Sequence, residues 1–255
     1  MGPPRTPGHP LPPGISRTRA PRGTPSGLAL DRAPGAGPGG LADLLGHDPA
    51  GTESVAVDGK TARGSRTETA PAAHLLSAVT AAGRTVSQLR VPDKTNEITA
   101  FTALLAPFDL TGAVVTADAL HTQREHAKWL VERKNAHYLM VGKGNQPKLH
   151  AALKALPWKE VTARRSDREA GHGRRETRSV RTVTVTGLDF PYLVQAVKIH
   201  RHRTDLKTGK VTRQTVHAIT DMTSSEASPQ LIGRIDSERS PTRRSPGDST
   251  YSDCP

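Results

Sequence analysis

Cysteine and aromatic residues are scarce in this chain. Its 255 residues include a single cysteine, Cys254, so one chain can form neither an internal disulfide framework nor a cysteine-ligated zinc site. We therefore expect a reducing, cytoplasmic setting. Aromatic residues make up 3% and hydrophobic residues 34% of the sequence, and both shares are low for a globular chain. Only part of the chain is thus expected to fold.

Long apolar runs are also missing. No run approaches the roughly 20 residues that a membrane helix needs, and the N-terminus lacks the apolar core of a signal peptide. The sequence predicts a soluble, unexported protein with no membrane partner.

Acidic residues are scarcer than basic ones. The chain has 24 Asp and Glu against 36 Lys and Arg, which gives a net charge of +12 and a pI of about 10.3. Because guanidinium groups match pairs of phosphate oxygens, a nucleic acid is the first partner that this charge suggests. A basic surface kept for solubility, or coding bias toward Arg, is the alternative.

Both ends of the chain lack the patterns of a folded segment. Residues 1–40 contain 10 Pro and 9 Gly with Asp31 as their one acid, and they show neither helical nor strand periodicity. Residues 236–255 consist mostly of Ser, Arg, Asp and Pro. We expect both segments to be disordered, because neither can bury enough apolar surface.

The middle of the chain alternates between strand and helix patterns. The periodicity predicts, in order, a strand at 53–57, a hairpin over 74–91 that turns at Ala82-Gly83, a helix at 96–108, a strand at 112–120, a helix at 122–134, a strand at 136–143 and a helix at 146–156. Period-two alternation then predicts strands within 178–187, 191–201 and 213–220, and a short helix follows at 223–235. There is no internal repeat.

Two carboxylates stand at the ends of apolar strands. Asp58 follows "VAV" and Asp118 follows "VVTA". If the two strands are neighbours, their side chains converge at one edge of the sheet, where a divalent cation such as Mg²⁺ or Mn²⁺ would relieve their repulsion. Each residue also has a simpler interpretation: Asp58 with Gly59 forms a common turn dipeptide, and Asp118 can cap a following helix.

Six sequence blocks occur in a fixed order within residues 53 to 220. They are "VAVDGKTARGS", "HLLSAV", "DKTNEITAFTALL", "DLTGAVVTADALHTQREHAKWL", "YLMVGKGNQPKLH" and "GHGRRETR". In order and spacing they resemble the ISAs family of bacterial insertion-sequence transposases, within the DDE superfamily. The resemblance implies an α/β fold with a ribonuclease-H-like core, a mixed sheet flanked by helices. We assign residues 41–160 to this core and 161–222 to a β-rich insertion.

The resemblance also implies a reaction and its partners. Asp58 and Asp118 correspond to the first two acids of the DDE triad, which holds two divalent metals, Mg²⁺ or Mn²⁺, for phosphodiester cleavage and strand transfer. The implied partner is DNA, both the ends of the insertion element and the target, in the bacterial cytoplasm and associated with the nucleoid. The resemblance leaves open whether the protein forms a homodimer.

Further polar residues fall in the matching blocks. The candidates for contacts with DNA are Lys60, Arg63, Lys94, Asn96, Lys143, Asn145, Gln146, His172, Arg174 and Arg178. For the Lys and Arg residues a solvated surface role is the alternative. His121 could cap, orient Asp118 or touch DNA, and the sequence does not choose between these roles.

The third acid of the triad has no clear counterpart. The family's catalytic Glu lies on a helix after the β-rich insertion, in a Trp-containing block that ends in Ile-Glu-Asn, and this chain has no such block. Glu176 is a candidate third acid, but it opens an alternating strand. Glu226 fits better as a residue in the first turn of a helix capped by Ser224 or Ser225.

The sequence thus predicts a transposase that is catalytically incomplete. Both ends depart from the family, so we expect a decayed gene, truncated or frameshifted near residue 235 and upstream of about residue 40. A noncatalytic DNA-binding remnant and a metal-dependent nuclease that uses Glu176 are the alternatives.

Overall fold

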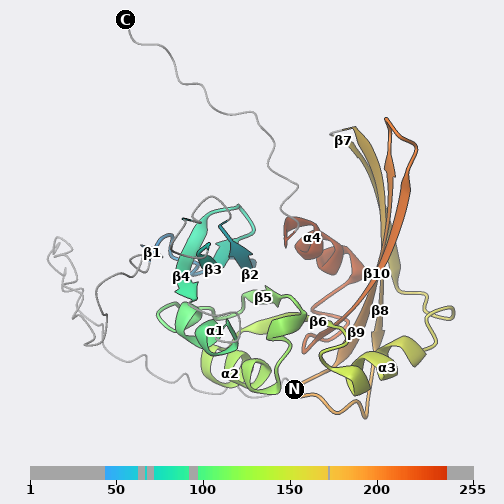
Figure 1. Cartoon of the computed structure of the whole chain (residues 1–255). Coiled ribbons are helices and arrows are strands. Elements are labelled where there is room, and N and C mark those ends of the chain that lie inside the picture. The colour runs from blue at the N-terminus through green and yellow to red at the C-terminus, as the bar shows by residue number, and fades with distance from the viewer. Residues whose placement is uncertain (1–43, 63–66, 68–71, 92–96, 172, 240–255) are drawn as a thin grey trace, which may run out of the picture. The chain divides into compact units, whose positions relative to one another are not determined.

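The structure is a computed structural model, and it describes residues 44–62, 67, 72–91, 97–171 and 173–239 (Figure 1). All of these residues belong to one compact unit, Gly39–Pro255. The fold is of the predicted mixed α/β class, with ten strands in one sheet and four α-helices among the described residues. None of these helices is long and apolar enough to cross a membrane. The segments 1–40 and 240–255, which we expect to be disordered, lie outside the described residues.

Apart from β1 and η3, which are not predicted from the sequence, the first part of the chain follows the predicted order of strands and helices. Its elements are β1 (Leu44–Leu45), β2 (Ser54–Thr61), β3 (His74–Thr80), β4 (Thr85–Val91), α1 (Glu97–Leu105), β5 (Val114–Ala117), the 3-10 helix η3 (Ala119–His121), α2 (Arg124–Lys134), β6 (His137–Gly142) and α3 (Pro147–Ala155). Gly83 turns the predicted hairpin at a φ of 78°, a conformation that glycine adopts without strain. Pro147 stands in the first turn of α3, where its missing N–H costs nothing.

The second part is richer in strands than the sequence predicts. It contains β7 (Arg164–Gly171), β8 (Arg174–Thr184), β9 (Gln195–Asp205), β10 (Val211–Thr220) and α4 (Pro229–Arg239). Strands β8, β9 and β10 are predicted from the sequence, but β7 is not. Its sequence, RRSDREAG, is exposed at seven of eight positions, so hydrophobic alternation gives no signal. Pairing with β8 along its whole length holds it in place.

Helix α4 begins later and ends later than predicted. The predicted helix covers residues 223–235, whereas α4 begins at Pro229, after Ser228, whose Oγ accepts a hydrogen bond from the Leu231 amide at 3.3 Å. It continues through residues 236–239, which we expected to be disordered. The reason is an ion pair: the carboxylate of Asp236, which is 4% exposed, accepts two hydrogen bonds from Arg201 at 2.6 and 2.8 Å.

The sheet combines parallel and antiparallel pairing. Its strand order is β1-β4-β3-β2-β5-β6-β10-β9-β8-β7. Only the pairs β2 with β5 and β5 with β6 are parallel. Three neighbouring strands therefore point their C-terminal ends toward one edge of the sheet, which we call the carboxyl edge.

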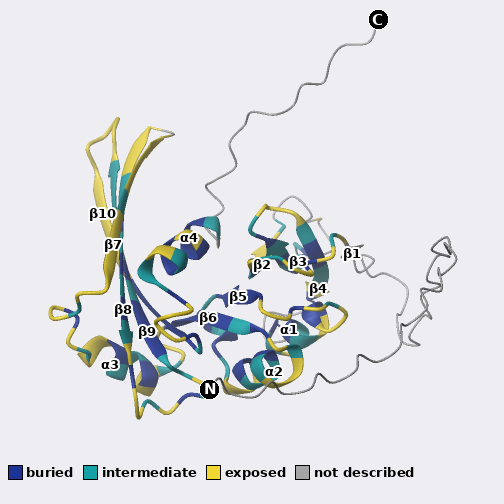
Figure 2. Ribbon diagram, turned by 180° about the vertical axis from the view of Figure 1, so that it is seen from behind, coloured by how far each residue is buried: buried dark blue, intermediate teal, exposed yellow. Residues whose placement is uncertain are grey.

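Strands β7 to β10 form a ribbon that passes this edge (Figure 1). Strand β10 runs antiparallel to β6, and His217 lies opposite Gly142, the last residue of β6. Residues 211–216 of β10 therefore lie beyond the C-terminal end of β6. The ends of the ribbon are largely exposed (Figure 2).

Each face of the sheet has its own hydrophobic core. One core joins the sheet to α1, α2 and α3 and includes Val57, Phe101 and Leu130. The other joins it to α4 and includes Ile199 and Ile232. We call the two sides of the sheet the three-helix face and the α4 face. Because side chains alternate along a strand, a residue's register decides to which face it belongs.

One ion pair links the beginning of β6 to the end of β10. His137 Nδ1 lies 2.7 Å from Asp221 Oδ2, and Asp221 Oδ1 accepts a hydrogen bond from the Tyr138 amide at 2.8 Å. The hydrogen bond to Asp221 raises the pKa of His137 above its ordinary value of 6.5, against the opposing effect of burial. Folding therefore favours the protonated form of His137, because only in the folded protein does Asp221 lie beside it.

This pair predicts a pH dependence of stability. Because the pKa of His137 is raised on folding, its contribution is complete below pH 6.5 and is lost as the pH rises through the folded-state pKa. We expect the free energy of unfolding to fall on this account as the pH rises above about 6.5. In His137→Gln this decrease should be absent, while His47→Gln, which leaves the pair intact, should retain it. Urea unfolding across the pH range measures both, and an unchanged decrease in His137→Gln would contradict the assignment.

Candidate active site

The parallel pairing of β2 with β5 brings Asp58 and Asp118 together in register. The last parallel pair joins Val57 to Ala117, and each carboxylate is the next residue along its strand. Val57 and Ala117 both belong to the core on the three-helix face. By alternation Asp58 therefore lies on the α4 face, and Asp118 follows the same alternation as it leaves β5. The two strands on which the predicted convergence depends are thus neighbours, and each acid directly follows the same paired position.

Asp58 and Gly59 do not form a turn. Strand β2 continues past them to Thr61, and Asp58 pairs with Ser77 of β3 while Gly59 pairs with Leu76. The turn interpretation of this dipeptide is wrong, because β3 extends the sheet beyond the point where β5 ends. Asp58 is held in an extended backbone, which fixes the direction of its side chain.

Asp118 does cap a helix. It precedes η3, and its Oδ1 accepts a hydrogen bond from the Leu120 amide at 3.0 Å. This bond confirms the capping interpretation and also restricts the carboxylate to one orientation. A carboxylate has two oxygens, so the oxygen of Asp118 that does not cap the helix could still bind a metal ion.

Lys60 accompanies Asp58 on the same side of β2. Its Nζ lies 3.4 Å from Asp58 Oδ2, with side chains 63% and 47% exposed. An ion pair so open to water contributes little to stability. Lys60 or Asp58 can therefore leave this ion pair and bind a ligand at a small cost in free energy.

The segment after β6 supports the loop that carries Asp118. Asn145 Nδ2 donates to the carbonyl of Ala119, and Gln146 Nε2 donates to that of Thr122 at 3.0 Å. Two predicted DNA contacts thus prove to brace the residues around η3. Lys143 is exposed in the same segment.

A buried cluster beneath this edge was not predicted from the sequence. Glu97, at the start of α1 and 6% exposed, accepts a short hydrogen bond from His74 of β3. His121 Nε2 lies 3.6 Å from the other oxygen of Glu97. Three separate elements supply these residues, so no spacing in the sequence could reveal them. His121 is 1% exposed, which excludes a contact with DNA in this conformation, and it packs near Phe101 at 5.1 Å between ring centroids.

Glu176 lies on the ribbon, on the α4 face of β8. Its Oε1 accepts a hydrogen bond from Arg178 at 2.9 Å and its Oε2 one from Arg203 at 2.6 Å. Burial acts to raise the pKa of Glu176, but the hydrogen bond from Arg203 and the two positive charges outweigh it, so the pKa lies below its ordinary value. Both carboxylate oxygens are thus already bound to arginines.

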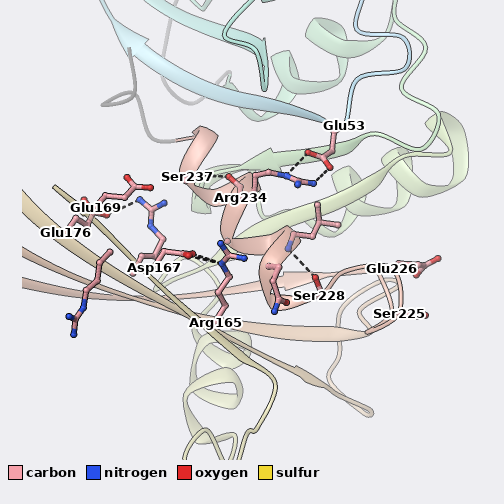
Figure 3. A pocket seen from close by; sticks show the side chains of 15 residues that line it. Glu53, Arg165, Asp167, Glu169, Glu176, Ser225, Glu226, Ser228, Arg234 and Ser237 are labelled. Atoms are coloured by element: carbon pink, nitrogen blue, oxygen red, sulfur yellow. Dashed lines mark hydrogen bonds and ion pairs between the residues drawn. The ribbon is translucent and has the colours of Figure 1, made fainter. Parts of the chain in front are cut away.

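Glu176 lines a cavity of about 560 Å³ between β7, β8 and α4 (Figure 3). Acids and arginines pair along its wall: Arg165 with Asp167, and Arg234 with Glu53. Neither Asp58 nor Asp118 lines this cavity.

The other candidates for acids and bases lie elsewhere. Glu226 accepts hydrogen bonds from the amide and hydroxyl of Thr223 at 2.7 and 2.8 Å, in a turn that precedes α4. It is therefore not in the first turn of a helix, because α4 starts three residues later. Arg178 is buried and also lies 3.5 Å from Asp236, whereas Arg174 is exposed on β8. Arg63, Lys94, Asn96 and His172 lie outside the described residues.

No group of three or more acids, histidines or cysteines in the described part of the chain is arranged to hold a metal ion. At the carboxyl edge the candidate metal ligands among the described residues are therefore the carboxylates of Asp58 and Asp118.

Comparison with known proteins identifies related sequences. Residues 49–240 match the family described as "Transposase DDE domain". "Putative transposase YncI" of Escherichia coli O157:H7 is 36% identical over 162 residues, which are 60% of this chain and 41% of that protein. YncI of strain K12 is 36% identical over 140 residues, 52% of this chain and 56% of that protein. "H repeat-associated putative transposase YbfD" of K12 is 33% identical over 140 residues, 52% and 55% of the two chains. The chain spans about half the length of these curated relatives.

The buried cluster predicts a specific need for glycine at position 59. A Cβ on Gly59 would lie 2.6 Å from Glu97 Oε2 and 3.0 Å from its Cδ. Since Glu97 is buried and bound to His74, we expect Gly59→Ala to lower the free energy of unfolding by about 1–3 kcal/mol. Gly144→Ala is the matched control, because nothing lies within 4 Å of its added Cβ. Urea unfolding measures both, and a Gly59→Ala variant as stable as the control would show that Glu97 is not held in this position.

Proposed function

Because the chain belongs to the transposase DDE domain family, we propose that Asp58 and Asp118 are the first two metal ligands of a site for phosphodiester cleavage and strand transfer on DNA. Family membership also confirms the transposase resemblance of the six sequence blocks. The observation that supports the proposal is the parallel register of β2 and β5, in which Asp58 and Asp118 each directly follow the last paired residue at the carboxyl edge.

The proposed core is ribonuclease-H-like. It consists of the part of the sheet ordered β4-β3-β2-β5-β6, in which a three-strand antiparallel meander continues into parallel strands. Helices α1 and α2 connect the strands on the parallel side. This arrangement supports the proposal, since it combines a mixed sheet with flanking helices and places both acids at strand ends.

The residues present fit a divalent cation. Asp58 is half-exposed and Asp118 partly so, so a hydrated ion can reach both. Mg²⁺ is commonly held by one or two carboxylates together with water, and the two negative charges favour a cation between them. A divalent ion bound there would help to deprotonate an attacking water or DNA 3′-hydroxyl and would stabilise the leaving oxygen.

The neighbouring residues have distinct proposed roles. Lys60 is placed to leave Asp58 and bind a phosphate oxygen. Asn145 and Gln146 keep the loop after Asp118 in one position, and the Leu120 amide orients the carboxylate of Asp118. Each of these contacts reduces the motion of a proposed ligand, as a metal site requires.

We further propose that catalysis is incomplete without a third ligand from outside the described residues. Within these residues no third acid joins the pair. Glu176 would have to leave both Arg178 and Arg203 to bind a metal, which argues against the nuclease alternative.

Metal binding gives the first test. At a Mn²⁺ concentration of 100 times Kd, a bound ion should stabilise the folded protein by about 2.7 kcal/mol, visible as a rise in melting temperature. Asp58→Asn and Asp118→Asn should abolish this rise, and Asn retains the capping ability of Asp at position 118. Asp189→Asn is the control, since the Asp189 side chain is 93% exposed and pairs with Arg124. Equal stabilisation of all the variants would contradict the proposed site.

DNA cleavage gives the second test. We expect the protein to bind Mn²⁺ without cutting a supercoiled plasmid, because no third acid joins the pair among the described residues. Cleavage that depends on Mn²⁺ and disappears in Glu176→Gln would overturn this expectation and establish the nuclease alternative. No response to Mn²⁺ in either experiment would favour a noncatalytic DNA-binding remnant.

A further inference from the structure

The ribbon of β7 to β10 separates its charges by face. On the α4 face the acids Asp167, Glu169, Glu176 and Asp205 alternate with arginines. On the three-helix face the register brings together Arg164, Arg168, Arg175, Arg181, Lys198 and Arg213. No Asp or Glu of the described ribbon strands falls on that second face. The separation follows from the alternation of side chains along each strand.

The basic residues form rows across the strands. One row runs from Arg164 through Arg181 and Lys198 to His217. Like charges directly opposite one another destabilise a sheet. This arrangement therefore weakens the isolated fold, and an anionic partner would relieve the repulsion.

The positive charges near His217 also affect its pKa. Burial, as the larger cause, and the neighbouring charges of Lys198, His150 and Lys154 together lower the pKa of His217 to about 4. Positive potential thus extends from the ribbon to helix α3.

Two hollows open on this face. One, of about 380 Å³, is lined by Lys159, Arg181, Lys198 and His200 among others. The second, of about 260 Å³, includes Arg175 and His202. Among the described residues no acid lines either hollow, in contrast to the cavity beside α4, where arginines pair with acids (Figure 3).

We infer that the three-helix face of the ribbon binds the phosphate backbone of duplex DNA. The inference rests on the proposed function, and it adds a surface for the DNA beside the site. Arg175 and Arg181 are six residues apart on β8, or about 20 Å. A duplex carries about 12 phosphates over that length of its axis, so several cations can contact phosphates at once.

Two features favour a duplex over a single strand. Proteins that bind single-stranded nucleic acid stack the bases on aromatic side chains, and the described ribbon strands contain no Phe, Tyr or Trp. Trp158 lines the first hollow, but it is 5% exposed and Lys198 lies over its ring, so it offers little surface to a base. A stiff sheet that presents guanidinium groups suits backbone contacts that do not depend on sequence.

The position of this surface defines its role. The ribbon passes the carboxyl edge of β6, but Asp58 lies on the α4 face. DNA bound on the three-helix face would therefore lie beside the metal site, and it would contribute to affinity without contacting Asp58.

A pair of double variants of the full chain tests the inference. Arg175→Gln/Arg213→Gln removes two exposed cations from the three-helix face. The matched control, Arg165→Gln/Arg234→Gln, removes two exposed cations from the α4 side, where Arg165 pairs with Asp167 and Arg234 pairs with Glu53. Both pairs lower the net charge equally.

Fluorescence anisotropy with a 30-base-pair duplex of mixed sequence provides the measurement. The first variant should bind about tenfold or more weakly at 0.1 M salt, and the slope of log K against log salt should decrease by about 1.8. The control should change little in either quantity. Equal losses in both variants, no loss in the first, or tighter binding of a single-stranded RNA of the same length would overturn the inference.

The outcome can be separated from the test of the metal site. If the first variant loses DNA affinity but keeps its Mn²⁺-dependent stabilisation, the surface and the site are independent, as we expect. If DNA affinity is unchanged while Mn²⁺ stabilisation still requires Asp58, the surface is wrong and the proposed function stands. If DNA affinity falls as expected but Mn²⁺ has no effect on the wild-type chain, the surface stands and the proposed metal site fails.

Discussion

The parallel pairing of β2 with β5 is the constraint on which the rest of the account depends. It places Val57 beside Ala117, so the carboxylates that follow emerge together at the carboxyl edge. A shift of one residue would turn one of the acids toward the opposite face. Two contacts protect this register. The pairing of β2 with β3 keeps Asp58 in an extended strand, and the Leu120 amide restrains Asp118. The geometry of the proposed site is a consequence of strand alignment.

Charged residues are distributed differently over the two faces of the sheet. On the α4 face of the ribbon each positive charge of the described strands has an acid nearby, as in the pairs Arg201 with Asp236 and Arg203 with Glu176. These pairs join α4 to the ribbon and stabilise the fold. The three-helix face of the ribbon has cations without acids among its described strand residues. The fold therefore gathers part of the excess positive charge of the chain on one face of the ribbon, and the distinction between the acid-paired arginines and those of the proposed DNA surface depends on the register of each strand.

The sequence predicts the order of the core elements because hydrophobic periodicity and turn residues such as Gly83 and Pro147 act locally. It also identifies Asp58 and Asp118, since each follows a short apolar run. Other features depend on contacts between distant segments. The polar strand β7 exists because β8 pairs with it, and the last turn of α4 is held by Arg201 from β9. The cluster of Glu97, His74 and His121 requires three elements to meet. The roles of Asn145 and Gln146 emerge only when β6 is placed beside β5.

The location of a bound metal tests the central claim most directly. Crystals of the full chain soaked in Mn²⁺ would show the ion by its anomalous scattering. The account predicts a peak at the carboxyl edge within coordination distance, about 2.0–2.6 Å, of oxygens from both Asp58 and Asp118. A peak bound instead to Glu176, or an empty edge at a saturating Mn²⁺ concentration, would contradict it.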